Sequence, residues 1–207
     1  MLDKKIYNFV QSRSRPKRMH LFYKILNIKR DTRVLDVGGT LFNWNLAPFI
    51  PDLTILNIYP FYESLPPNVK WVVGDARCMS FKDKSFDVVF SNSVIEHVGS
   101  WEDQKKFAQE IKRVSDCYFI QTPNYWFPVE THLITPFIHW LPSRLAMLIL
   151  RFSVKSLITK DLENSIKFYN EVRLLKPREM KLLFPEAAIY YEKLFIFRKS
   201  IYAIKRL

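Results

Sequence analysis

The sequence predicts an α/β fold, a doubly wound and mostly parallel sheet that an antiparallel hairpin closes at one edge. Short apolar runs alternate with segments of helical periodicity, which is typical of repeated strand–helix–strand units. Five of these runs end in small, polar or acidic residues, and such sheets bind ligands at the carboxyl ends of their strands. The 207 residues suffice for one domain with a full core.

The expected elements follow one another at short intervals. A basic arm and a helix are expected over residues 1–30, with helical spacing over 19–28. The arm before it is interpreted as a solvated tail, with a surface helix as the alternative. Parallel strands are expected at 33–37, 53–58, 68–73, 85–91 and 117–122, and the closing hairpin at 189–197 and 200–205. Helices are expected at 42–49, 101–114 and 177–184.

Residues 125–175 have a different character and predict an inserted helical lid within the single domain of residues 1–207. Their first part, 125–157, is rich in aromatic residues, Leu and Pro, and 160–172 is polar and expected at the surface. The apolar stretch is flanked by Arg144, Arg151 and Lys155, as in segments that lie on a membrane surface. A lid over a substrate, a membrane contact and ordinary packing all remain open.

The net charge of +12 indicates an anionic partner, such as a phosphorylated substrate, anionic lipid or nucleic acid. A lysine-rich genome produces the same excess. Cys78 and Cys117 stand far apart without a CxxC pattern, which argues for a reducing compartment and against a disulfide framework or a structural zinc. Neither a signal peptide nor an apolar run of about 18 residues is found. A cytoplasmic protein is expected, with contact to the inner face of the membrane as an addition.

Two of the four glycines, Gly38 and Gly39, directly follow the first predicted strand. A strand that leads into a glycine turn is typical of nucleotide-binding α/β folds. The spacing GxxxxGK[ST] of a phosphate-binding loop is absent, and so is the GxGxxG of a dinucleotide site. S-adenosylmethionine is a third candidate ligand, since it has no phosphate to bind.

Three stretches resemble the class I S-adenosylmethionine-dependent methyltransferases, in particular their small type 11 domain. They are VLDVGGT at 34–40, GDA at 74–76 and FKDKSFDVVFSNSVIEHV at 81–98. The resemblance covers residues 34–123, and more weakly the last 35 or so. It implies a Rossmann-like fold, methyl transfer and S-adenosyl-L-methionine as the cofactor. Thr40 and Phe42 depart from the small residues usual in the first motif, and Asn57 from the usual acidic residue.

The resemblance also implies eight cofactor-binding residues. They are Asp36, Gly38 and Gly39 at the methionine end, Asn57 at the ribose, Asp75 and Ala76 at the adenine, and Ser91 and Asn92 beside the sulfonium.

Methyl transfer to a hydroxyl needs a base, and His97, His132 and Glu130 are the candidate catalytic residues. For His97, packing and helix capping are the plainer alternative, and a metal site built from all three is less favoured. The expected acceptor is a small molecule, a sugar or a lipid-linked compound. The alternatives are an RNA methyltransferase, against which no RNA-binding module or amine-methylating motif is seen, and a non-catalytic cofactor-binding protein.

Overall fold

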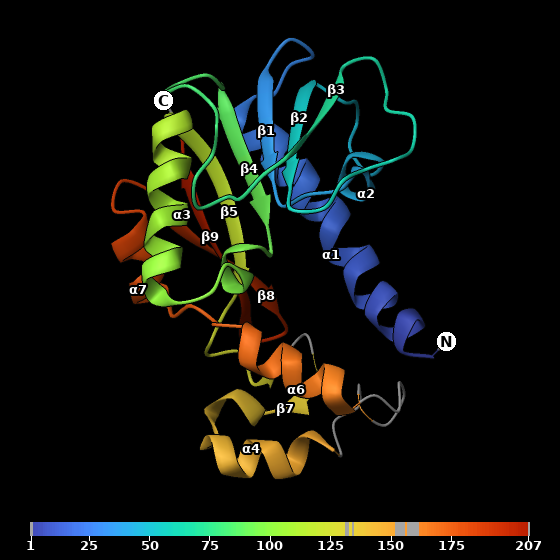
Figure 1. The fold of residues 1–207 in the computed structure, drawn as a ribbon, viewed down its shortest axis with the longest axis vertical. Helices are drawn as coiled ribbons and strands as arrows, with labels where there is room; N and C mark the ends of the chain where they lie inside the picture. Colours follow the sequence, from blue (N-terminus) through green and yellow to red (C-terminus); the bar gives the residue numbers. More distant parts are fainter. Residues whose placement is uncertain (1, 131–132, 134, 152–155, 157–161, 207) are drawn as a thin grey trace.

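The computed structural model of the chain describes residues 2–130, 133, 135–151, 156 and 162–206 (Figure 1). Its centre is a seven-stranded sheet with the order β3-β2-β1-β4-β5-β9-β8. The strands are β1 (Arg33–Val37), β2 (Asp52–Asn57), β3 (Val69–Val73), β4 (Val88–Asn92), β5 (Cys117–Pro123), β8 (Ala188–Leu194) and β9 (Phe197–Lys205). The first five are parallel, and β9 is antiparallel to both β5 and β8. The predicted fold class is therefore confirmed.

The central strands are mostly apolar and buried, as expected for a sheet that helices cover on both faces. All seven residues of β5 are buried, as are the last four of β1. On one face lie α1 (Leu2–Leu26) and α2 (Leu41–Trp44), and on the other α3 (Trp101–Val114) and α7 (Pro177–Leu183).

Each face has its own core. Phe22 of α1 and Trp44 of α2 pack against Phe90 and Phe119 of the sheet, with ring centroids 4.8 Å apart for Phe22 and Phe90. On the other face, Phe107 and its neighbours in α3 meet the opposite side of β4 and β5. Strand residues that alternate between the two faces thus anchor two layers of helices, which makes the sheet rigid enough to position the loops at its ends.

The structure differs from three of the expected elements. The N-terminal arm belongs to α1, which runs from Leu2 and contains Pro16, so the expected solvated tail is wrong. The helix expected at 42–49 ends at Trp44, and turns precede Pro48. Residues 162–171 form a helix, within the stretch predicted as a helical lid but in its polar part, for which a surface position was the specific expectation.

The closing hairpin turns earlier than its alternation suggests. Its turn is formed by Phe195 and Ile196, and Leu194 pairs with Phe197 across it. Phe195 has a φ of 54°, a left-handed conformation that Gly or Asn usually supplies. The sequence contains no turn residue there, which is why alternation alone extends the first strand to residue 197.

Residues 125–175 form a separate layer beyond the carboxyl ends of the parallel strands, at the bottom of Figure 1. Their described elements are β6 (Val129–Glu130), β7 (Thr135–Pro136), the 3₁₀ turn η2 (Ile138–Trp140), α4 (Ser143–Leu150) and α6 (Leu162–Glu171). Leu133, Ile138, Ala146 and Leu150 form a small core of their own. In the described part of the chain, no helix combines the length and apolar character needed to cross a membrane.

Candidate functional site

A cleft of about 990 Å³ opens at the carboxyl ends of β1, β2 and β3, which is a size typical of ligand sites. The 3₁₀ turn η1 (Ile95–His97) and the end of α6 complete its wall. Four of the eight predicted cofactor-binding residues line it, namely Gly38, Asn57, Asp75 and Ala76.

The glycine pair is required by contacts within the chain itself. Gly38 has a φ of +74°, and a Cβ there would lie 2.6 Å from both γ-carbons of Val94. A Cβ on Gly39 would lie only 1.8 Å from Oδ2 of Asp36. One glycine therefore permits the left-handed turn, and the other lets the chain pass directly over a carboxylate.

Asp36 supports this loop from beneath and is fully buried. Its Oδ2 accepts a hydrogen bond of 2.7 Å from Nε1 of Trp44, whereas its Oδ1 has no hydrogen-bond partner among the described residues. Burial raises the pKa of this carboxyl to about 7, although the bond from Trp44 acts in the opposite direction. Asp36 thus holds the shape of the loop that Gly38 presents to the cleft.

Asn57 ties the end of β2 to the same loop. Its Nδ2 donates to the carbonyl of Gly39 at 2.8 Å, and its Oδ1 accepts from the amide of Tyr59 at 3.0 Å. An acidic residue here could not donate to a carbonyl. The amide therefore fixes the position of the glycine loop at the edge of the cleft.

Asp75 forms a two-pronged ion pair with Arg77, in which Nη2 lies 2.6 Å from Oδ2 and Nε lies 3.0 Å from Oδ1. Hydrogen bonds from Arg77 lower the pKa of Asp75, so it is a carboxylate at neutral pH. Arg77 also donates to the carbonyl of Val98 at 3.3 Å. The sequence reasoning missed Arg77, although its position two residues after Asp75 is a usable signal.

Ser91 and Asn92 form no part of the cleft wall. The buried hydroxyl of Ser91 donates to the carbonyl of Val37 at 3.0 Å, and Oδ1 of Asn92 accepts from Arg18 at 3.0 Å. The next two residues, Ser93 and Val94, line the cleft instead. Ser93 has a φ of 59°, so the chain turns sharply at the end of β4, and the residues that line the cleft lie two positions further along the chain.

The candidate bases are divided between two cavities. His97 lines the cleft, whereas Glu130 lines a second cavity of about 360 Å³ between residues 125–139 and residues 169–179. Oε2 of Glu130 accepts a hydrogen bond of 2.6 Å from the amide of Leu133. His132 lies outside the described residues. Within the described residues, no group of three or more His, Cys, Asp and Glu side chains could hold a metal ion.

His139 belongs to the second cavity, which sequence reasoning had not connected with the site. Its Nε2 lies 2.9 Å from the carbonyl of Tyr125, and its buried Nδ1 has no hydrogen-bond partner among the described residues. Burial lowers the pKa of this imidazole, although the carbonyls of Tyr125 and Phe127 oppose the effect. His139 is therefore neutral at pH 7.

Arg173 lines both cavities and forms part of the wall between them. Its Nη1 donates to Oε1 of Gln104 at 2.6 Å and its Nη2 to Oε1 of Glu179 at 2.5 Å. Its backbone amide donates to the carbonyl of Glu96 at 2.8 Å, next to the candidate base His97. The end of the lid is thereby fixed to η1, α3 and α7.

A buried cluster of charged and polar side chains closes the other part of the carboxyl edge. Arg18 of α1 donates to Glu192 at 2.8 Å, to Asn92 and Gln121 at 3.0 Å, and to Ser200 at 3.2 Å. Lys199 is also buried, with its Nζ 3.9 Å from Glu192. Burial acts to raise the pKa of Glu192, but the two cations outweigh it and the pKa falls.

Comparison with known proteins agrees with the interpretation of the residues at the strand ends. Residues 60–116 match the methyltransferase domain family. The matched stretch includes Asp75 and His97 but excludes the glycine pair. This partial match, together with the fold, indicates a class I, S-adenosylmethionine-dependent methyltransferase domain.

Solved structures share the fold of this chain at low sequence identity. The PH0226 protein from Pyrococcus horikoshii OT3 has a TM-score of 0.60 at 16% identity, over 94% of this chain and 90% of that one. The phosphoethanolamine N-methyltransferase 2 of Haemonchus contortus, in complex with S-adenosyl-L-methionine, has a TM-score of 0.57 at 15% identity. That match covers 86% of this chain and 38% of the Haemonchus protein, so the chain spans about two fifths of its length.

The cleft fits the cofactor in size and in chemistry. Its volume lies in the range of ligand sites, a left-handed glycine stands at one end, and an ionised carboxylate stands at the end of β3. Asn57 lies between Gly38 and Asp75, and its side-chain oxygen Oδ1 accepts from the amide of Tyr59 at the edge of the cleft.

Proposed function

We propose that the methyltransferase transfers the methyl group of S-adenosylmethionine to a small-molecule, sugar or lipid-linked acceptor, and that the cavity beneath the lid binds this acceptor. The observation that carries the proposal is the adjacency of the two cavities, which have Arg173 in common. Since methyl transfer is an in-line displacement, donor and acceptor need adjoining sites that open toward each other.

In this proposal the cofactor lies along the cleft. Gly38 faces its methionine end, Asn57 its ribose, and Asp75 with Ala76 its adenine. The remaining predicted residues act indirectly: Asp36 and Gly39 hold the glycine loop from below, and Ser91 and Asn92 fix the end of β4.

The cavity beneath the lid suits an acceptor that carries an anionic group. Nζ of Lys176 lies 4.9 Å from the ring centroid of Tyr125 and 5.6 Å from that of Trp126, and no ion pair to it is found in the described part of the chain. Tyr125 and Tyr169 bring two further hydroxyl groups to the cavity. A cation beside two phenols favours a phosphate or a carboxylate.

The carboxylate of Glu179 is already engaged. It accepts from Arg173 at 2.5 Å and from the amide of Lys176 at 2.8 Å, so it offers little competition for the ammonium group of Lys176. The Haemonchus enzyme has also been solved in complex with phosphomonomethylethanolamine and S-adenosylhomocysteine. An acceptor with a phosphate and a nucleophilic nitrogen or oxygen is thus the class to test first.

The reaction breaks the bond between the methyl carbon and sulfur and forms one between that carbon and the acceptor atom, whose proton passes to a base. His97 is the predicted base that borders the cleft. Glu130 borders the acceptor cavity, and His132 precedes Leu133 of that cavity by one position. Neutral His139 also borders this cavity, although its free Nδ1 is buried.

Calorimetry with S-adenosylmethionine and S-adenosylhomocysteine tests the cofactor half of the proposal, and binding that weakens in Asp75→Ala is expected. The acceptor half is tested by S-adenosylhomocysteine release with phosphoethanolamine and with small phenolic and carboxylate acceptors. For any acceptor that is turned over, Lys176→Gln should raise KM about tenfold and leave cofactor binding intact. Unchanged KM in Lys176→Gln would move the acceptor out of the lid cavity.

A further inference from the structure

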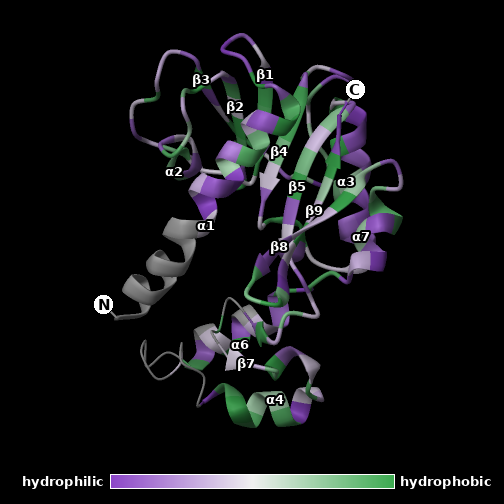
Figure 2. Cartoon of the chain, turned by 180° about the vertical axis from the view of Figure 1, so that it is seen from behind, coloured by the Kyte–Doolittle hydropathy of each residue, from purple (hydrophilic) through white to green (hydrophobic). Residues whose placement is uncertain are grey.

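After Ser143 and Arg144, helix α4 is apolar on all sides although only one side is buried. Ala146 and Leu150 pack into the core of the lid, while Leu145 is 50% and Leu148 is 59% exposed on the rest of the helix. Figure 2 shows α4 as a largely hydrophobic helix at the end of the molecule, away from the sheet. A helix with this composition is normally covered all round, so its outer face indicates a binding surface.

The hairpin turn between β8 and β9 is equally apolar and even more exposed. Phe195 is 89% and Ile196 is 84% exposed, in a position where turns usually carry Gly, Asn or Asp. The turn is flanked by the exposed cations Lys193 and Arg198. Two large apolar side chains in a left-handed turn serve no packing purpose within the chain.

A series of aromatic contacts connects the hairpin to the lid. The ring centroids of Phe197 and Phe127 lie 6.5 Å apart, and those of Trp126 and Trp140 6.3 Å apart. Trp126 is 56% exposed, and Phe137, whose ring centroid is 5.4 Å from that of Trp140, is 51% exposed. The hairpin turn, these rings and the outer face of α4 together form what we call the apolar lid surface.

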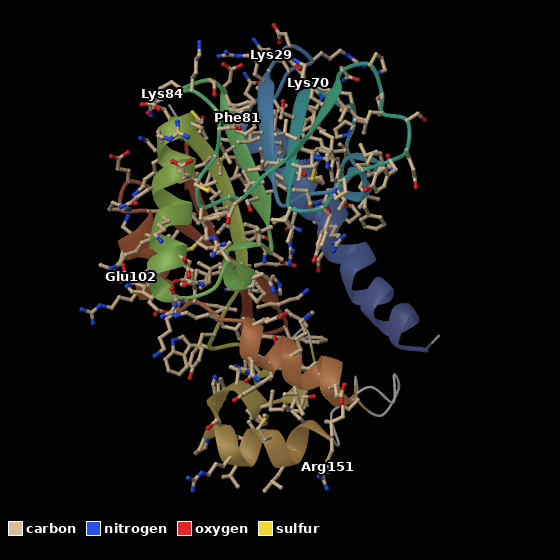
Figure 3. The ribbon with its side chains drawn as sticks, viewed as in Figure 1. Lys29, Lys70, Phe81, Lys84, Glu102 and Arg151 are labelled. Carbon is tan, nitrogen blue, oxygen red and sulfur yellow. The ribbon has the colours of Figure 1, made fainter. Side chains whose placement is uncertain are left out.

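The charged residues within the α4 and hairpin segments of the apolar lid surface are all positive. Residues 135–151 and 193–198 contain no Asp or Glu, and their cations Arg144, Arg151, Lys193 and Arg198 are exposed. Figure 3 places Arg151 at the end of the lid that is farthest from the sheet. Exposed Trp, Phe and Leu bordered by Arg and Lys are typical of helices and loops that insert into the headgroup region of a bilayer.

We propose that the apolar lid surface binds an anionic lipid bilayer. A second copy of the chain is a poorer occupant, because a two-fold contact would bring the same cations face to face without an acidic partner. An anionic bilayer instead supplies negative charge to the rim and hydrocarbon to the apolar side chains. The net charge of +12 adds long-range attraction to such a surface. This binding is independent of the methyl-transfer proposal.

Flotation with phosphatidylcholine vesicles, with and without phosphatidylserine, tests the proposal on the full chain. Strong binding is expected only with phosphatidylserine, and added salt should weaken it. The double variants Leu145→Ser/Leu148→Ser and Phe195→Ser/Ile196→Ser should each reduce partitioning about tenfold, because each removes apolar area that the bilayer covers. Arg144→Gln/Arg151→Gln should reduce it severalfold.

Two matched controls separate this surface from general stickiness and charge. The apolar control is Leu182→Ser, because Leu182 is 64% exposed on α7. The charge control is Lys29→Gln, because Figure 3 places Lys29 at the opposite end of the sheet. Both controls should bind vesicles as the unmodified chain does, and unchanged circular dichroism shows that every variant is folded. The proposal is overturned if the lid variants bind as well as the controls, or if the unmodified chain does not float with anionic vesicles. Self-association that the lid variants abolish, without vesicle binding, would overturn it in favour of a second copy.

Discussion

The two parts of the sheet's carboxyl edge treat their polar side chains in opposite ways. At the ends of β1, β2 and β3, the polar groups border an open cleft and are linked by a few local contacts, such as the pair Asp75–Arg77. At the ends of β4, β5 and β9, Arg18 arrives from a helix at the other end of the chain and binds side chains from β4, β5, β8 and β9. The same edge is thus open in one part and closed in the other.

This difference between the open and the closed part indicates that one part serves ligand binding and the other serves stability. A carboxylate that is partly exposed, as Asp75 is, can exchange part of its hydrogen bonding for a ligand at little cost to the fold. The Arg18 guanidinium is almost fully buried and all its partners belong to the protein. Substitutions in the closed part should therefore affect folding, whereas those in the open part should affect binding.

Removal of Arg18 should have the largest effect on stability, because it disrupts the hydrogen bonds of the closed part. Arg18→Met leaves the half-buried Glu192 with only the hydroxyl of Tyr202 and the more distant Lys199, so we expect a loss of about 3–5 kcal/mol in the free energy of unfolding. Urea denaturation measures it. The exposed pair Arg33–Asp87 provides the control, because Arg33→Met should cost below about 1 kcal/mol. Equal losses in both variants would mean that the Arg18 cluster is no more than a surface ion pair.

The buried carboxyl beneath the open part should make stability depend on pH. Asp36 has its pKa raised from 3.8 to about 7 by burial, so the folded state holds its proton longer than the unfolded state. This contribution is fully present below about pH 4 and is lost as the pH rises to about 7, by up to roughly 4 kcal/mol. Asp36→Asn keeps an acceptor for Trp44 but cannot ionise.

Measurement of the free energy of unfolding across this pH range isolates the effect. The free energy of unfolding of the unmodified chain, minus that of Asp36→Asn, should fall steadily as the pH rises. A difference that does not change with pH would show that Asp36 is ionised and solvated in the folded protein.

A methyl group on the glycine loop should reduce both stability and binding. In Gly39→Ala the new Cβ would overlap Oδ2 of Asp36, so the loop must move, at a cost of about 1–3 kcal/mol. Calorimetry should show that S-adenosylmethionine binding is weakened at least as clearly. Gly74→Ala is the control, because its Cβ would meet only the end of Leu56 at 3.0 Å. If Gly74→Ala proves the more damaging variant, the close approach of Asp36 is not what requires the glycine.

Replacement of Asp75 should have the smallest effect on stability and should mainly weaken cofactor binding. Asp75→Asn removes an exposed ion pair and should change the free energy of unfolding by below about 1 kcal/mol. Affinity for S-adenosylmethionine should fall about tenfold, since a charged acceptor is replaced by a neutral one. Asp87→Asn, at the amino end of β4, removes a similar pair and should leave affinity unchanged. The comparison between open and closed parts fails if Asp75→Asn destabilises the chain as Arg18→Met does.

Local patterns were sufficient for the sheet and for much of the cleft. Apolar runs that end in Gly38, Asn57 and Asp75 indicated parallel strands and placed these residues together, because parallel strands end at one edge. The exact cleft wall at β4 could not be found in this way. The left-handed turn at Ser93 moves the exposed position from Ser91 and Asn92 to Ser93 and Val94, and no sequence signal marks it.

By itself, the sequence determined the succession of strands and helices, the glycine pair and the acidic residue that ends the cleft, since each depends on neighbours within a few positions. Only the tertiary structure decided what those residues bind. Arg18 and Asn92 are 74 positions apart, Arg173 and Gln104 are 69 apart, and the aromatic contacts of the lid join three separate segments. Contacts of this kind arise from the packing of whole layers, because a side chain's partner across the sheet leaves no pattern in its own stretch of sequence.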